Sequence, residues 1–128
     1  THLDHALQPA REKAASLILE RIRSTATAVI PLLLVGDFNA YAGDNPVYDQ
    51  LVRQGGLIDT WPAATVRRQE QMNSFNGFET AKAEGKRIDW ILSRGPVAVR
   101  ASEIVTFSRD GQWPSDHFPV AAWLTFAG

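Results

Sequence analysis

The chain has 128 residues, of which 45% are hydrophobic and 21% charged. That composition is typical of a globular domain and excludes intrinsic disorder and collagen-like structure. Thirteen basic and fourteen acidic residues give a net charge of -1, which disfavours a protein that coats nucleic acid through a basic surface. The sequence contains no cysteine, so disulfides and thiolate-bound metals are excluded. No apolar run approaches the roughly 18 residues of a membrane-spanning helix.

The chain opens with Thr1-His2-Leu3-Asp4-His5, so side chains of chemical interest stand at its first positions. The ends of an isolated domain usually fray, which makes this an unfavourable place for a functional side chain. We therefore expect a processed chain or a piece of a longer one.

The first half of the chain predicts two helices and one strand. Residues 9–24 show helical spacing, and the expected core-facing stripe is Ala10, Ala14, Leu17, Ile18 and Ile22. Residues 30–36 form a short apolar run, which indicates a buried central strand. Asn45 is a candidate N-cap directly ahead of Pro46, and the helix that follows should end at Gly55-Gly56.

The second half predicts mostly strands. Residues 62–86 are polar and read as a long loop with a short strand near Ser74-Phe75. Strands are expected at residues 87–93, 97–107 and 119–126. The element order therefore predicts an α/β layered protein with a mixed sheet.

Polar side chains of chemical interest stand at the ends of the apolar runs. Asp37 and Asn39 follow the first predicted strand, Asp89 lies in a later one, and Asp116-His117 precede the last. Functional groups in α/β proteins gather where strands end and loops begin. Oxygen ligands without cysteine suit Mg²⁺ or Mn²⁺ rather than structural zinc. Hydrolysis of a phosphate ester requires a divalent ion, a base and hydrogen-bond donors, which these residues would supply together.

Each motif also has a purely structural interpretation. The segment at Asp37 is compatible with an ordinary turn, and the one at Asp116 with an Asx turn that leads into a strand. A carboxylate inside an apolar strand is costly unless it is paired. The partner of Asp89 is therefore either an arginine, Arg87 or Arg94, or a catalytic histidine.

Five motifs, in their order along the chain, are more specific than any one of them. They are Thr-His-Leu-Asp-His (1–5), Gly-Asp-Phe-Asn-Ala (36–40), Ser-Phe-Asn-Gly-Phe (74–78), Arg-Ile-Asp-Trp-Ile-Leu (87–92) and Ser-Asp-His-Phe-Pro-Val (115–120). This series resembles the C-terminal half of the endonuclease/exonuclease/phosphatase superfamily, the DNase I-like metal-dependent phosphoesterases. The resemblance covers residues 1 to about 126.

The resemblance implies half of a four-layer α/β sandwich, with a mixed, mostly antiparallel sheet and flanking helices. Residues 1–128 would be the C-terminal portion of one domain, with the N-terminal half, its metal-binding Glu and its early Asn absent. The inner sheet face would then be exposed and drive association, either with the missing half or with a second copy. We expect that face to include parts of Leu32, Leu34, Ile88, Trp90, Val120 and Ala122.

The resemblance also implies roles on the side of the attacking water. Asp37 would orient or deprotonate the water and share in metal binding. Asn39 would donate a hydrogen bond to a phosphate oxygen or help to hold the nucleophile. His2 would be a phosphate-side histidine and a proton donor to the leaving oxygen.

A second group of residues would serve the metal and the phosphate. Asp116 would bind Mg²⁺ or Mn²⁺, and His117 would contact the phosphate. Asp89 would hold the imidazole of His117 in the right tautomer. Ser74 and Phe75 would support the site. The implied activity is metal-dependent phosphoester hydrolysis, with this chain alone inactive or nearly so.

Two alternatives and the substrate stay open. The opening motif superficially resembles that of metallo-β-lactamase-like zinc hydrolases, although three histidines are too few for their site. A non-catalytic binding module on the same fold is the other alternative. DNA, RNA, lipid and small phosphoesters all remain candidate substrates. A basic cluster near the loop would meet an anionic substrate or simply be solvated: Arg67, Arg68, Lys82, Lys86 and Arg87.

Overall fold

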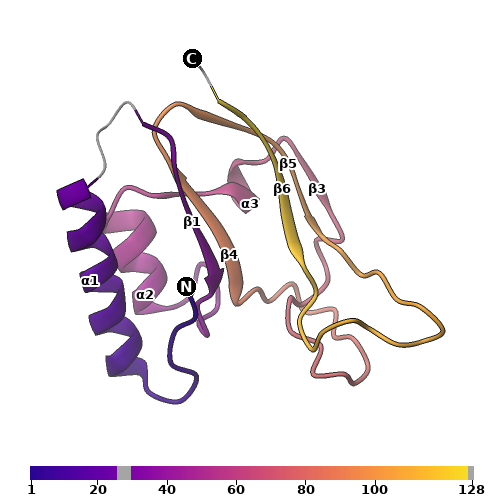
Figure 1. Cartoon of the computed structure of the whole chain (residues 1–128). Coiled ribbons are helices and arrows are strands. Elements are labelled where there is room, and N and C mark those ends of the chain that lie inside the picture. The colour runs from indigo at the N-terminus through magenta and orange to yellow at the C-terminus, as the bar shows by residue number, and fades with distance from the viewer. Residues whose placement is uncertain (26–29, 127–128) are drawn as a thin grey trace.

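The chain folds into two small sheets with helices on one side of them (Figure 1). The computed structural model describes residues 1–25 and 30–126. Its elements are α1 (Gln8–Thr25), β1 (Leu32–Asp37), α2 (Pro46–Tyr48), the π-helical turn η1 (Asp49–Gln54), β2 (Ile58–Asp59), α3 (Thr60–Ala63), β3 (Val66–Arg68), β4 (Asp89–Arg94), β5 (Val97–Ile104) and β6 (Val120–Phe126). None of the helices in the described ranges combines the length and apolarity needed to cross a bilayer.

In the part of the chain that the structure describes, each sheet has three strands. The first has the order β1-β4-β2 and is antiparallel, and the second has the order β3-β5-β6 with a parallel β3–β5 pair. The predicted mixed, mostly antiparallel α/β architecture is therefore confirmed. The strand predicted as central, β1, instead lies at one end of its sheet order, and Leu33 and Val35 on it are about half exposed. A continuous apolar run does not distinguish a strand buried on both faces from one buried on a single face.

The core lies between the first sheet and the helices α1, α2 and η1. Trp90 of β4 stacks on Phe38, with ring centroids 4.3 Å apart, and meets Tyr48 edge to face at 5.3 Å. Helix α1 confirms the prediction for residues 9–24, but its buried stripe is Ala15, Leu19 and Ile22. Leu17, expected in the stripe, is 51% exposed. The face of α1 that contacts the core is therefore rotated about the helix axis relative to the predicted one. Ala14 and Ile18, expected at its centre, are only partly buried at its edge.

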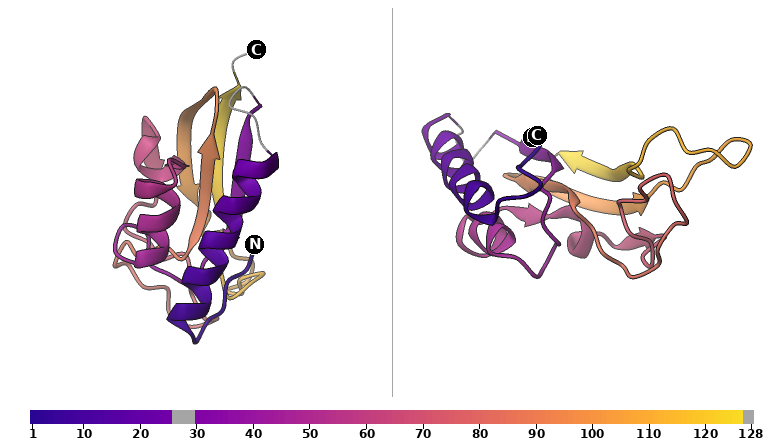
Figure 2. Two further views of the ribbon diagram at one scale, coloured as in Figure 1. Left: turned by 90° about the vertical axis from the view of Figure 1, so that its left-hand side faces the viewer. Right: turned by 90° about the horizontal axis from the view of Figure 1, so that it is seen from below.

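The prediction of the exposed sheet face is wrong. Leu32 and Leu34 pack against the core on the helix side, and Trp90 is fully buried there. Val120 and Ala122 pair with the buried Ile104 and Ser102, so they share the face that α3 covers. The open face instead carries the alternate residues Leu33, Val35 and Trp123. Side chains alternate between the two faces of a strand. A prediction shifted by one residue therefore assigns every side chain of the strand to the wrong face. The view from below shows α2 and α3 on the same side of the strands (Figure 2).

The second helix and the long loop follow the prediction only in part. Asn45 caps α2, accepting a hydrogen bond from the backbone N–H of Val47, and Pro46 occupies the first turn. The helix continues as η1 to Gln54 and ends at Gly55, as predicted. The loop at 62–86 also contains β3, whose three exposed residues gave no apolar signal.

A buried ion pair ties the helices to the start of β4. The Nη2 atom of Arg87 lies 2.8 Å from Oδ2 of Asp59, and both side chains are more than 90% buried. Burial, followed by the charge of Asp59, raises the pKa of Tyr48 to about 12, so its hydroxyl stays protonated and donates to Asp59 at 3.2 Å. The Arg87 guanidinium also lies over the Trp61 ring, 4.8 Å from the centroid. This network fixes the backbone two residues before Asp89.

We expect Asp59→Asn to lower the free energy of unfolding by about 3 kcal/mol, because it leaves the buried Arg87 charge uncompensated. The measurement is urea unfolding followed by tryptophan fluorescence. Asp49→Asn is the matched control, since it removes an Asp–Arg pair with Arg53 that lies at the surface. It should cost no more than about 1 kcal/mol. Equal losses in the two variants would contradict the assigned role of the buried pair.

Candidate active site

The N-terminal residues reach the site by running alongside the end of β1. The Thr1 amino group donates to the carbonyl of Val35 at 2.7 Å, and the Leu3 N–H donates to the carbonyl of Asp37 at 2.9 Å. Gly36 has φ +149°, and a Cβ at this position would lie 1.8 Å from the Thr1 carbonyl oxygen. Only glycine permits so close a passage of the two backbones. The N-terminal segment that passes Gly36 thereby places His2 beside Asp37.

Asp37 ends β1 with its carboxylate held by local bonds. Its Oδ1 accepts a hydrogen bond from the backbone N–H of Asn39 at 2.7 Å, and Asn39 takes the left-handed conformation with φ 48°. Asn39 Nδ2 donates to the Leu3 carbonyl at 2.9 Å, so this amide also anchors the N-terminal segment. The Nε2 atom of His2 lies 3.4 Å from Asp37 Oδ2, although the His2 side chain is 73% exposed.

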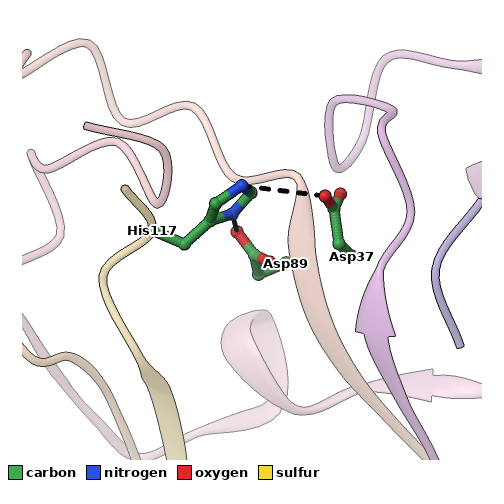
Figure 3. Close-up of side chains that lie close together, drawn as sticks. All are labelled: Asp37, Asp89 and His117. Atoms are coloured by element: carbon green, nitrogen blue, oxygen red, sulfur yellow. Dashed lines mark hydrogen bonds and ion pairs between the residues drawn. The ribbon is translucent and has the colours of Figure 1, made fainter. Parts of the chain in front are cut away.

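His117 lies between two carboxylates that face each other across the β1–β4 pair (Figure 3). Its Nδ1 is 2.9 Å from Oδ2 of Asp89, and its Nε2 is 3.8 Å from Oδ2 of Asp37. The sequence left three possible partners for Asp89, and the structure pairs it with the histidine. Arg87 is paired with Asp59 instead. The Asp89 bond directs the other ring nitrogen, Nε2, toward Asp37.

Ser74 holds the Asp89 and His117 segments together, which is more than the support expected from the sequence. This fully buried residue accepts hydrogen bonds at Oγ from the N–H groups of Ile88 and Asp89, at 2.9 and 3.2 Å. Its carbonyl accepts from the N–H of Phe118 at 2.7 Å. The next residue, Phe75, bridges to His117 and places its ring edge to face on the imidazole, with centroids 5.1 Å apart. Ser74 is the only serine among residues 62–86, and nothing in the sequence around it indicates that its hydroxyl is bonded to the start of β4.

The titration of the Asp89–His117 pair is set by burial and by neighbouring charge. Burial raises the pKa of Asp89 above its ordinary value, and the hydrogen bonds with His117 and Ser74 only partly offset this. Burial alone lowers the pKa of His117, but the bond to Asp89 and the charges of Asp89, Asp37 and Asp116 together raise it. The cluster therefore favours a protonated imidazole.

Three side chains of the site lie close enough together to hold a metal ion. Asp37, Asp89 and His117 each offer one ligand atom, and these atoms lie within 4.8 Å of one another. Asp116 lies outside that group. Its carbonyl accepts hydrogen bonds from the N–H groups of Asn76 and Gly77, at 2.8 and 2.9 Å, and its Oδ1 is 3.3 Å from the Ser115 hydroxyl.

The expected site residues are thus brought to one end of the sheets from separate parts of the chain. His2, Asp37, Asn39, Asp89 and His117 are linked by the contacts above, and Asp116 adjoins them through the backbone of His117.

The expected basic cluster does not form one surface. Arg87 is buried, and three other members pair with carboxylates: Arg67 with Glu70, Arg68 with Glu103 and Lys86 with Glu84.

The α/β fold, with carboxylates and a histidine gathered at the strand ends, is the arrangement expected from the five motifs, and the comparison with known families agrees. Residues 2–117 match the model of the Endonuclease/Exonuclease/phosphatase family. The chain belongs to that family, and its fold is the DNase I-like fold predicted from the motifs. This membership separates it from the zinc hydrolases that the opening motif superficially resembled.

Solved structures give the same result. The chain is similar to an endonuclease/exonuclease/phosphatase family protein from Bacteroides thetaiotaomicron, with 29% identity and a TM-score of 0.87, covering 98% of this chain and 47% of that one. A mannosyl-6-phosphatase from the same organism is 30% identical, with a TM-score of 0.82 and coverages of 98% and 49%. A functionally unknown conserved protein from Enterococcus faecalis is 33% identical, with a TM-score of 0.81 and coverages of 99% and 48%. No curated protein matches the chain. The chain spans about half the length of these solved relatives.

We expect Asp89→Asn to lower the pKa of His117, because it removes the carboxylate charge that stabilises the imidazolium. The measurement is a pH titration of the His117 ring resonances by NMR, with EDTA present to keep the chain free of metal. Asp110→Asn, in the exposed loop before β6, is the control and should leave the titration unchanged. A His117 pKa that does not change in Asp89→Asn would show that the bond between them does not set the titration.

Proposed function

We propose that the chain carries one side of the active site of a divalent-metal-dependent phosphoester hydrolase. The observation that carries this proposal is the line of contacts from Asp89 through His117 to Asp37, at 2.9 and 3.8 Å. Family membership supports it, since the family is hydrolytic, and one similar structure is of a mannosyl-6-phosphatase.

In the proposed reaction, Asp37 accepts a proton from the attacking water, for which its largely buried carboxylate at the end of β1 is suited. His117, protonated and oriented by Asp89, donates from Nε2 to a phosphate oxygen and stabilises the charge that grows on it. His2, at 3.4 Å from Asp37 and largely exposed, is free to protonate the leaving oxygen. Asn39 retains a second amide hydrogen beyond the one given to Leu3, and we assign it to a phosphate oxygen.

The residues of the site fit Mg²⁺ or Mn²⁺. Two carboxylates face each other across one strand pair with a single imidazole between them, and all the donors are oxygen or nitrogen atoms. We assign as the metal ligands Asp37, which belongs to this group, and Asp116, which adjoins it through the backbone of His117, while Asp89 and His117 keep the hydrogen bond between them. A bound ion would polarise the phosphoryl group and stabilise the developing negative charge.

We further propose that the active enzyme needs a second structural half. The chain covers 47–49% of the solved relatives described above, and the face with Leu33, Val35 and Trp123 is open. That face would be covered either by the other half of the fold or by self-association. Phosphate esters are the proposed substrates, with nucleic acid among the open classes.

We expect the full-length protein that contains this chain to hydrolyse p-nitrophenyl phosphate or a simple phosphodiester in the presence of Mg²⁺. Asp37→Asn and Asp116→Ala should each lower kcat by at least about a hundredfold, because they remove the general base or a metal ligand. Asp44→Asn, in an exposed loop, is the control variant.

The same assay distinguishes an enzyme from a binding module. If full-length protein with an intact site binds phosphate esters but shows no turnover with Mg²⁺ or Mn²⁺, the non-catalytic alternative holds. If it turns over only with Zn²⁺, the assigned metal is wrong.

The 128-residue chain alone should show little or no metal-dependent turnover, because the resemblance places a further metal ligand in the other half of the fold. The measurement is phosphate release per mole of chain, together with the oligomeric state from light scattering. Addition of EDTA is the control for residual activity. Robust turnover by a demonstrated monomer would contradict the need for a second half.

A further inference from the structure

A cavity of about 520 Å³ adjoins the catalytic cluster and is not used by the proposed reaction. It lies between the start of α1, the segment after β1 and the loop that precedes β4. Two of its wall residues also belong to the site: Asn39, two positions after Asp37, and Phe75, whose ring packs on the imidazole of His117. A phosphate group at His117 would therefore have its attached alcohol within reach of the cavity.

The wall combines aromatic surface with charged groups. Tyr41 and Phe75 are each about half exposed. The charged side chains are Arg11, Lys82 and Lys86 on one hand and Glu79 and Glu84 on the other, so the two signs nearly balance. Because the two signs nearly balance, the wall gives a second charged group little net attraction, whereas hydroxyl groups can bond to cationic and anionic side chains alike.

Apart from Asn39, whose second amide hydrogen is assigned to a phosphate oxygen, the asparagines of the wall all form their hydrogen bonds within the fold. Asn73 accepts from the N–H groups of Glu84 and Lys86, Asn76 bonds Phe78 and Ser115, and Asn45 caps α2. Lys86 is paired with Glu84 and lies over the Tyr41 ring. Lys82 forms no ion pair within the described residues, so it and the exposed Glu79 supply a donor and an acceptor for a ligand.

We propose that this cavity binds the alcohol part of the substrate, and that this alcohol is a neutral polyhydroxylated ring, a sugar. A sugar offers an apolar face of C–H groups to aromatic rings and hydroxyls that both donate and accept. The cavity offers both kinds of contact, since most of its lining residues are polar or charged and two of them are aromatic. Tyr41, Phe75 and Lys82 are then the residues that determine specificity. The inference rests on the proposed function, because the phosphate is assumed to lie at His117.

The test is binding by the 128-residue chain, followed by ¹⁵N NMR in Mg²⁺ buffer. The probes are glucose 6-phosphate, inorganic phosphate, glucose and adenosine 5′-monophosphate. We expect glucose 6-phosphate to shift the amide signals of Gly77 and Lys86 as well as that of His117, and to bind at least tenfold more tightly than inorganic phosphate. Inorganic phosphate should shift only the signals around His117.

Variants assign the binding to the cavity. Tyr41→Ala and Lys82→Met should each weaken glucose 6-phosphate binding by about fivefold or more, because each removes one hydrogen bond or ring contact, and leave inorganic phosphate unaffected. Lys13→Met, exposed on α1, is the matched control and should change neither.

The proposal is overturned if glucose 6-phosphate binds no more tightly than inorganic phosphate, or if Lys82→Met and Tyr41→Ala bind it as well as the parent chain. Tighter binding of adenosine 5′-monophosphate would replace the sugar with a nucleoside. If glucose shifts Gly77 and Lys86 while no phosphate compound shifts His117, the proposed phosphoesterase site fails and the sugar pocket stands.

Discussion

The pairing of Asp37 with Asp89 across β1 and β4 is the constraint around which the site is organised. Like charges directly opposite each other on one sheet face destabilise a strand pair unless a group of opposite charge lies between them. His117 is that group, since its two ring nitrogens face the two carboxylates at 2.9 and 3.8 Å. The two carboxylate charges whose repulsion His117 offsets also raise the pKa of its imidazole. The interaction that offsets the repulsion between Asp37 and Asp89 is thus the same one that raises the pKa of His117.

The surrounding elements hold this arrangement from both sides. Ser74 fixes the start of β4 and the segment before β6 in register, so that Asp89 and His117 meet. The buried pair of Arg87 and Asp59 anchors the same start of β4 to the helix layer beneath it. On the other side, Gly36 lets the N-terminal segment run against β1 and deliver His2. A rigid helix-backed layer therefore supports side chains that are themselves only partly buried.

Much of this could be predicted from the sequence, because the motifs are local. The longer strands β1, β4, β5 and β6, the Asn45 cap and the fold class follow from short-range patterns, and the motif order identified the family. Strand facing could not be predicted in the same way: Leu32 to Val35 are apolar at every position, so the sequence contains no alternation to show which residues face the helices. The partners of Arg87 and Asp89 were equally undetermined, because residues 28 positions apart are joined only by the tertiary fold.

The open sheet face and the cavity beside His117 differ in a way that bears on specificity. The face with Leu33, Val35 and Trp123 is apolar and built on strands, which suits a protein surface more than a small substrate. The cavity instead lies in loops tied together by buried amides, with its charged groups left at the surface. Changes in Tyr41 or Lys82 would disturb neither Ser74 nor the Asp89–His117 bond. The reacting groups and the groups that select the alcohol can therefore vary independently, although Phe75 contacts both.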